Sequence, residues 1–277
     1  MKNLIAAISI MATGAALASA VTSDTTFGVL KVTSTNLQTV ISVPWEAVGS
    51  GDVKVKDFVK TSNLIPGTKP ESTELMDGDK LYLYSVDDET GEGSYKGWFL
   101  NSTNVWEGLA DPDDPITTGT DGDTIKRGSA LILVRPRPPE NTETNIYLYG
   151  QYTTDTPSFN IVRRSDKVVN SLFAPINDGS TPIYVNQQTT SGRKYLAWTN
   201  PSTGDKIKLQ LPNGRAATFV YDAARFDEDR TTGWALNING TLYCEQAQIL
   251  PGMGAWYMAV EGSNAPSYTV TTVTPAP

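Results

Sequence analysis

The sequence predicts an all-β protein made of two homologous antiparallel units, each sandwich-like or barrel-like. Short runs rich in Val, Ile, Thr, Tyr, Phe and Trp alternate with clusters of Gly, Pro, Asn and Asp, which is the pattern of strands and turns. Helical periodicity is almost absent. A series of sequence blocks recurs in the same order after about 125 residues, as expected of an internally duplicated chain.

Ten runs have the composition of β-strands, and the turns between them predict a sandwich or a barrel. One further segment, residues 53–61, places Val55, Phe58 and Val59 on one helical face, so a short helix is expected there. The ten predicted strands are residues 27–33, 39–43, 80–84, 130–135, 145–149, 181–185, 206–211, 217–221, 233–238 and 255–260.

The repeated blocks are clearest where two strands begin. Residues 78–83 (GDKLYL) recur as residues 204–209 (GDKIKL). We expect each Gly-Asp-Lys step to form a tight turn, in which Gly takes a positive φ and Asp bonds its own backbone. Residues 125–133 (IKRGSALIL) recur as residues 249–257 (ILPGMGAWY), with a glycine turn expected before the last core strand of each copy.

Weaker echoes complete the two copies. Residues 40–44 (VISVP) correspond to residues 171–175 (SLFAP). Each copy also has an aromatic strand followed by a tryptophan, which is Trp106 in the first copy and Trp234 in the second. The same order at a nearly constant offset predicts one ancestral unit present twice.

The first twenty residues have the three parts of a secretory signal. Lys2 provides a positive start, an apolar stretch reaches Leu17, and residues 18–20 (ASA) have the small side chains that a signal peptidase accepts. The stretch is shorter than the ~20 residues that span a bilayer, and an uncleaved N-terminal anchor is the alternative. We therefore expect export to the periplasm, the cell surface or the extracellular space, with no membrane span after cleavage. The predicted division is a signal peptide over 1–20, a first β unit over 21–155 and a second over 156–277.

The composition argues against several classes of function. The chain has 30 acidic and 22 basic residues and a net charge of −8, which disfavours nucleic acid and anionic lipid as partners. It has no histidine and one cysteine, Cys244, which removes Ser-His-Asp and Cys-His catalysis and nearly all zinc sites. We expect Cys244 to be a small buried apolar residue. Paired carboxylates could hydrolyse glycosides, but no local motif selects such a pair.

A loop rich in aspartate, residues 110–123, is the candidate metal site. Calcium prefers six to eight oxygen ligands, and closely spaced carboxylates can supply several of them. The spacing matches no defined calcium loop, and a solvated acidic loop is the alternative interpretation. The candidate calcium ligands are Asp111, Asp113, Asp114, Asp121 and Asp123.

Exposed aromatic side chains could form a platform on which sugar rings stack. Trp45 and Trp198 are flanked by turn residues, so these two are the candidate ligand-binding residues. The other tryptophans lie in or beside the repeated blocks, where packing in the core is the simpler explanation. These are Trp98, Trp106, Trp234 and Trp256.

The chain resembles a family of exported bacterial proteins that has no assigned activity. The motifs that carry the resemblance are FGVLKVTSTNLQTVISVPW from residue 27, GDKLYLYS from residue 78, YKGWFL from residue 95, IKRGSALILVRP from residue 125 and IYLYGQYT from residue 146. The resemblance covers nearly all of the chain after the signal. It implies a signal peptide and a duplicated β unit, and it carries no functional residues over.

These observations favour a non-enzymatic structural or interaction protein of the cell envelope or extracellular space. Its partner would be a glycan or another envelope protein, with no cofactor apart from the candidate calcium ion. The alternatives are a carbohydrate-binding protein that uses exposed aromatics and a polysaccharide-active hydrolase. Self-assembly by strand exchange through residues 22–33 or 268–274 is a further variant.

Overall fold

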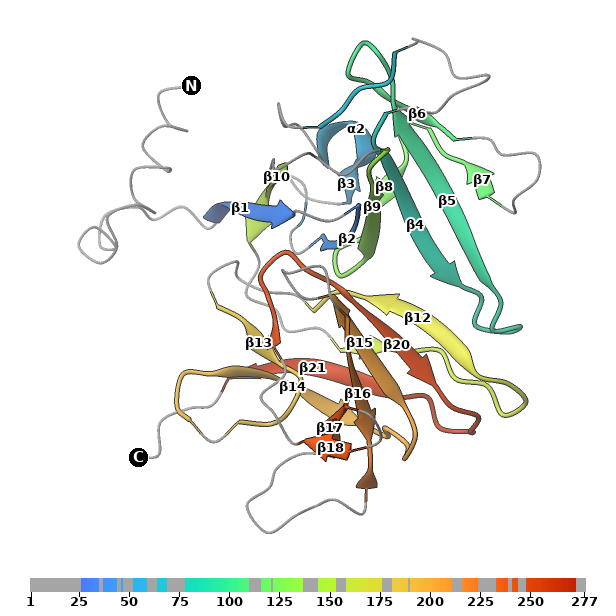
Figure 1. Cartoon of the computed structure of the whole chain (residues 1–277), viewed down its shortest axis with the longest axis vertical. Helices are drawn as coiled ribbons and strands as arrows, with labels where there is room; N and C mark the ends of the chain where they lie inside the picture. The colour runs from blue at the N-terminus through green and yellow to red at the C-terminus, as the bar shows by residue number, and fades with distance from the viewer. Residues whose placement is uncertain are drawn as a thin grey trace.

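The computed structural model confirms the all-β prediction (Figure 1). It describes residues 26–34, 37–43, 46, 52–58, 64–68, 78–109, 116–120, 122–136, 144–152, 158–175, 181–188, 190–210, 216–223, 233–238, 241–243 and 248–272. The predicted signal peptide, Cys244 and the predicted boundary at residue 155 lie outside this part of the chain. Within it, no helix has the length and apolarity that crossing a bilayer requires.

The first half of the chain is organised around one mixed sheet with the strand order β2-β9-β4-β5-β6. Strand β7 pairs with β5 in parallel, and two smaller sheets, β1-β10 and β3-β8, complete this half. Its strands are β1 (Thr26–Ser34), β2 (Gln38–Ser42), β3 (Val53–Lys54), β4 (Lys80–Val86), β5 (Gly93–Leu100), β6 (Trp106–Gly108), β7 (Ile116–Thr118), β8 (Thr124–Ile125), β9 (Ala130–Val134) and β10 (Thr144–Tyr152).

The second half consists of two larger sheets. One has the order β12-β20-β15-β16-β17-β18 and is antiparallel throughout, and the other has the order β11-β21-β14-β13-β19 with a parallel β13-β14 pair. Its strands are β11 (Phe159–Asn160), β12 (Val169–Phe173), β13 (Ile183–Tyr184), β14 (Lys194–Thr199), β15 (Lys206–Gln210), β16 (Ala216–Tyr221), β17 (Trp234–Ile238), β18 (Thr241–Tyr243), β19 (Gln248–Ile249), β20 (Ala255–Ala259) and β21 (Ser267–Thr272).

The two halves share one order of strands. The path β2-β9-β4-β5-β6 matches β12-β20-β15-β16-β17, and the small β3-β8 pair matches β13-β19. The glycine turns also match: Gly128 and Gly252 both have positive φ, at 84° and 77°. Each turn precedes the strand that lies second in its sheet, as the sequence predicts. This correspondence is what the predicted duplication requires, and the duplication itself stays a prediction.

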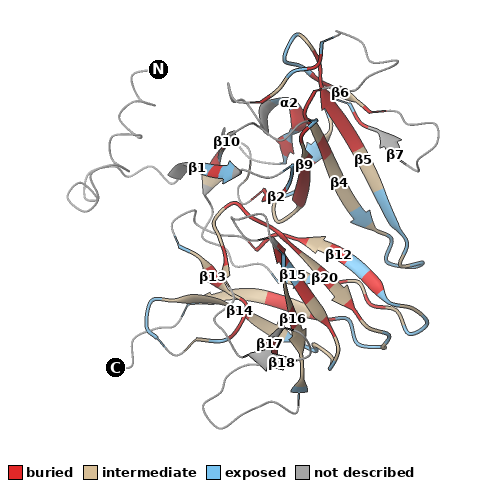
Figure 2. Ribbon diagram, viewed as in Figure 1, coloured by how far each residue is buried: buried red, intermediate tan, exposed pale blue. Residues whose placement is uncertain are grey.

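Each half has its own hydrophobic core between its sheets, as the buried residues in Figure 2 show. In the first half, Val32 of β1 and Ile146 of β10 pack with residues of the larger sheet such as Leu131. In the second half, Leu196 of β14 and Ile207 of β15 belong to opposite sheets and share one cluster. Alternating strand residues thus fill the space between facing sheets, which is the packing of a sandwich.

The halves meet along β2 and the turn before β20. Ile41 and Met253 form an antiparallel bridge, and the Ser42 amide donates to the Gly252 carbonyl at 2.8 Å. At Gly254 a methyl group would lie 2.8 Å from both the Phe173 carbonyl oxygen and Val40 Cγ1. Only a residue without a side chain fits between the two halves at this point.

The hairpin β4-β5 extends from the first half along the second (Figure 1). Its turn is closed by Asp87, whose carboxylate accepts the amides of Glu89 and Thr90 at 3.0 and 2.6 Å. Gly91, with a φ of 68°, lies so close to Arg164 that a methyl group there would be 2.6 Å from its Cγ. The tip of the hairpin is therefore packed against the second half.

One sequence expectation needs correction in detail, and the segments of another can be placed in the fold. The helix expected over residues 53–61 is the single turn α2 (Val55–Phe58), because residues 53 and 54 form β3 instead, and residues 59–61 lie outside the described part. The described residues of the two segments proposed for strand exchange are already paired inside the chain. Residues 26–33 pair with β10, and residues 268–272 pair with β14.

Candidate functional site

The outer face of the second half carries an unusual set of side chains on two neighbouring strands. Successive residues of a strand point to opposite faces, so β15 directs the buried Ile207 into the core and turns Lys206 and Lys208 outward. Strand β20 buries Tyr257 and turns Trp256 and Met258 to the same outer face. Two cations and one large aromatic ring are therefore neighbours on one sheet surface.

This surface and the β4-β5 hairpin line an open pocket with a volume of about 540 Å³. The volume lies within the range of about 300–1,000 Å³ that is typical of small-molecule sites. Strands β4 and β5 form one wall, and strands β12, β15, β16 and β20 form the rest. The described lining residues are Tyr84, Tyr95, Asn170, Lys206, Lys208, Thr218, Trp256 and Met258.

A row of four aromatic rings runs from one half to the other, and three of them, Tyr84, Tyr95 and Trp256, line the pocket. The Tyr84 and Trp256 rings cross the junction in an edge-to-face contact, with centroids 5.0 Å apart and an interplanar angle of 62°. Tyr95 lies 4.9 Å from Tyr84 on its other side, and Tyr82 continues the row 6.2 Å from Tyr95. All four rings are half-buried, so each keeps an accessible part.

Gly93 makes room for the central ring of this row. A methyl group on Gly93 would lie 1.9 Å from the Tyr84 hydroxyl oxygen, so the ring occupies the space that any side chain would fill. Burial, with a smaller contribution from Tyr95, raises the pKa of Tyr84 above its ordinary value of 10.0. The Tyr84 hydroxyl therefore stays protonated at neutral pH and can donate a hydrogen bond to a ligand.

The two lysines give the pocket its charge. They are two positions apart on β15, and their neighbours in register are Met258 beside Lys206 and Trp256 and Thr218 beside Lys208. Neither ammonium group forms an ion pair with any residue that the structure describes. The described lining includes no carboxylate.

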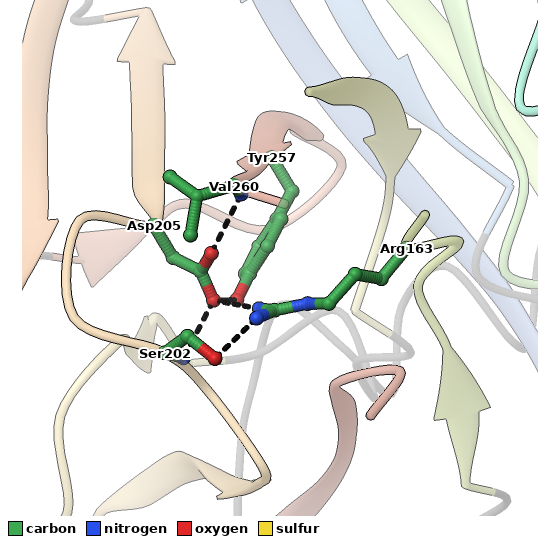
Figure 3. A network of polar contacts seen from close by, with 5 residues as sticks. All are labelled: Arg163, Ser202, Asp205, Tyr257 and Val260. Carbon is green, nitrogen blue, oxygen red and sulfur yellow. Dashed lines mark hydrogen bonds and ion pairs between the residues drawn. The ribbon is translucent and has the colours of Figure 1, made fainter. Parts of the chain in front are cut away.

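A buried network holds the strands that carry the lysines and Trp256 (Figure 3). The carboxylate of Asp205, directly before β15, accepts the Ser202 amide at 2.8 Å, the Tyr257 hydroxyl at 2.6 Å and the Val260 amide at 2.9 Å. The Arg163 guanidinium pairs with the same carboxylate and also donates to the Ser202 hydroxyl. The network thereby connects the start of β15 to the end of β20.

The first half has a corresponding anchor at the start of β4, the strand that carries Tyr84. Asp79 is fully buried and accepts the Arg135 Nε at 3.2 Å and the Ile65 amide at 2.8 Å. Burial raises the pKa of Asp79 above its ordinary value, and the hydrogen bonds from Ile65 and Arg135 oppose that rise. The strand that carries Tyr84 and the strand that carries the two lysines therefore each begin at a buried aspartate paired with an arginine.

These aspartates differ from the sequence expectation. Each Gly-Asp-Lys step was predicted to be a turn in which Asp bonds its own backbone two residues on, but both carboxylates bind arginines far away in the chain. Gly204 does take a positive φ of 98°, whereas Gly78 does not. At Gly78 a methyl group would lie 2.2 Å from the Leu100 carbonyl oxygen, so close backbone approach explains this glycine.

Trp198 is half-buried in the core of the second half, which differs from the expected exposure. Its ring lies 5.3 Å from that of Tyr257 and 5.2 Å from that of Tyr268, and its Nε1 donates to the Val185 carbonyl at 3.0 Å. The turn residues beside Trp198 mark the end of its strand, and they do not place its side chain at the surface. Trp45, the other candidate, lies outside the described residues.

The candidate calcium ligands are mostly outside the described part of the chain, namely Asp111, Asp113, Asp114 and Asp121. Asp123 is described, and its carboxylate pairs with the Lys96 Nζ at 2.8 Å and accepts the Thr120 amide at 2.5 Å. Each of its two oxygens therefore has one protein contact. Among the described residues no cluster of three or more metal-ligating side chains occurs.

Sequence reasoning missed Trp256, which was expected in the core. A signal was present, because the alternation in Lys206-Ile207-Lys208 places the lysines on one face. Pairing of this strand with β20 puts Trp256 on the lysine face, but the register is not visible in the sequence. The role of Tyr84 could not be predicted from the sequence either, because it depends on contact between the two halves.

Comparison with known proteins gave no matching family model, no matching curated protein and no matching solved structure.

Proposed function

We propose that this protein is an exported, non-enzymatic interaction protein that binds a carbohydrate in the pocket between its two halves. The observation that carries the proposal is the row of half-buried aromatic rings from Tyr82 to Trp256 along a pocket of about 540 Å³. A sugar ring presents apolar C–H groups on its faces and hydroxyls at its edge. Aromatic rings pack against the faces, and a few polar groups fix the orientation.

The polar groups of the pocket suit this ligand. The Asn170 amide can both donate and accept, the Thr218 hydroxyl can do the same, and the Lys206 and Lys208 ammonium groups donate. Hydroxyls of a saccharide are donors and acceptors at once, so they match such a mixed set. The row of rings is longer than one sugar, because it continues from the pocket to Tyr82, and this favours an oligosaccharide or polysaccharide chain.

The test is a binding screen of the purified protein against a panel of glycans and polysaccharides, followed by calorimetry on any hit. Trp256→Ala and Tyr84→Ala should each weaken binding about tenfold or more, equivalent to about 1.4 kcal/mol per tenfold. Tyr149→Ala is the matched control, because Tyr149 is a tyrosine on β10 that is 43% exposed and is not among the residues lining the pocket. Thermal unfolding of each variant separates lost binding from lost folding.

The same screen should be run with calcium and with a chelator. Binding that disappears in chelator would show that binding requires calcium and would implicate the aspartate-rich loop. Binding that is unchanged would show that calcium is not required. A panel without any saturable hit, in both conditions, contradicts the proposal.

A further inference from the structure

We infer that the pocket selects an acidic saccharide, one that carries carboxylate or sulfate groups, through Lys206 and Lys208. This inference rests on the proposed function and adds the chemical class of the ligand. It starts from a local reversal of charge: the whole chain has a net charge of −8, whereas the described lining of the pocket holds two cations and no anion.

Neither lysine ammonium group has a counterion among the described residues. Fully buried cations normally find a counterion, and the two buried arginines among the described residues do so. Arg135 pairs with Asp79, and Arg163 pairs with Asp205. Lys206 is half-buried and still has no ion pair with a described residue. A ligand with an anionic group would supply the missing partner, and a charge-assisted hydrogen bond is stronger than a neutral one.

The spacing of the lysines fits a repeating acidic ligand. Residues two apart on one strand are separated by about 6.6 Å along its axis, so the two ammonium groups form a short row on the sheet. Lys208 lies in register with Trp256 on one side and Thr218 on the other. An aromatic ring face, a cation and a hydroxyl of the protein therefore meet at one position. One acidic sugar unit could contact all three, through its C–H face, its anionic group and its hydroxyls.

The backbone that carries the two lysines is rigid. The backbone of β15 is paired on both sides, with β16 and β20, through both lysine positions. The strand begins at the buried Asp205 network, so the lysine backbones cannot shift without breaking it. The ligand therefore meets two cations at fixed backbone positions, and only the lysine side chains lose freedom on binding.

A polynucleotide also combines rings with anionic groups, but the negative net charge of the protein repels its many phosphates. Nucleic-acid binding takes much of its affinity from a basic surface around many phosphates. Two lysines within a chain of net charge −8 do not make such a surface. An acidic saccharide of a few units needs only the local cations and the aromatic row.

Calorimetry with four probes tests the inference: an oligogalacturonate, a sulfated dextran oligosaccharide, a neutral malto-oligosaccharide and an oligothymidylate. We expect an acidic saccharide to bind, and its affinity to fall about tenfold or more in Lys206→Gln and in Lys208→Gln. Lys126→Gln removes the same charge from an exposed turn and should leave binding unchanged. Comparing the affinities of the oligogalacturonate and the sulfated oligosaccharide shows whether the pocket prefers carboxylate or sulfate groups.

A second measurement covers the case in which a lysine variant fails to fold. Binding of the acidic probe to the unmodified protein should weaken steeply as salt is raised, because screening acts on the ammonium–anion attraction. Neutral and acidic probes that bind equally, with Trp256 required and the lysines dispensable, would overturn the inference and leave the proposed function standing. Failure of all three saccharide probes would overturn the inference, and a glycan panel without any hit would overturn the proposed function as well. Tighter binding of the oligothymidylate would replace the saccharide by a nucleic acid.

Discussion

Replacing Asp205 by Asn tests whether the buried network holds the second half together. Asp205 is fully buried, and the side chain of Arg163 is 1% exposed. The substitution keeps the shape of the side chain and removes its charge. One amide cannot replace the carboxylate, because four donors converge on its two oxygens: the Arg163 guanidinium, the Ser202 and Val260 amides and the Tyr257 hydroxyl.

The expected cost follows from what remains buried. Removing one partner of a buried ion pair costs about 3–5 kcal/mol, because the other charge is left without compensation. The amide NH₂ must also face one of the former donors, which leaves a buried donor unsatisfied at about 1–3 kcal/mol. The two terms overlap, so we expect a total loss near the upper part of about 3–5 kcal/mol. Since domains are typically stable by about 5–15 kcal/mol, this is a large fraction.

Urea unfolding followed by fluorescence or circular dichroism measures the loss. With a slope of about 1–3 kcal/mol per molar urea, the midpoint should fall by roughly 1–2 M or more. Asp166→Asn is the control, because Asp166 pairs with Arg164 on the surface at 61% exposure. A surface pair contributes about 0–1 kcal/mol, so the control should change little.

A double variant identifies the cause. Arg163→Met combined with Asp205→Asn removes the uncompensated cation, so part of the stability should return relative to Asp205→Asn alone. A loss below about 1 kcal/mol in the single variant, or a double variant that is less stable than the single one, would refute the reasoning.

Three further predictions concern the pocket, the junction and alkaline pH. Gly93→Ala should lower glycan affinity in calorimetry while the fold remains, because the new methyl group takes the place of the Tyr84 hydroxyl, 1.9 Å away; unchanged affinity contradicts the role of Tyr84. Gly254→Ala should cost about 1–3 kcal/mol in urea unfolding, because its methyl group would meet Val40 and Phe173 at the junction. Gly122→Ala, with only Thr120 Oγ1 at 4.0 Å, is the control for both and should change neither quantity. Burial raises the pKa of Tyr257 and Tyr268 above their ordinary 10.0, so stability is retained below pH 10 and falls above it by up to about 1.4 kcal/mol per pH unit for each group. Tyr268→Phe should make the fall in unfolding free energy between pH 9 and 11 less steep, and an unchanged slope would exclude Tyr268 as its source.

Strand positions were predictable from composition because apolar alternation and turn residues act locally. The expected strand at residues 39–43 is β2 (Gln38–Ser42), and the one at residues 80–84 begins β4 at Lys80. Strand β14 was missed, since Lys194, Tyr195 and Ala197 dilute its apolar pattern. The expected strand at residues 181–185 shortens to a two-residue β13. Strand ends depend on pairing partners, which composition does not contain.

The candidate site was far less predictable. Tyr84 and Trp256 belong to different halves, and only the docking of the hairpin on the second sheet brings their rings to 5.0 Å. Trp198 was expected at the surface because turn residues follow it, but its half-buried ring packs against the core of the second half. Exposure of a side chain depends on which sheet covers it, and that is a property of contacts between distant segments.

The sequence by itself determined the all-β class, the positions of about half of the described strands and the matching glycine turns at Gly128 and Gly252, because backbone preferences and side-chain alternation are local. Only the tertiary structure decided that Asp79 and Asp205 are buried beside distant arginines, and that Lys206, Lys208 and Trp256 share a pocket with Tyr84. Those outcomes depend on the register between strands and on the contact between the two halves, in which residues far apart in the chain remove one another from water.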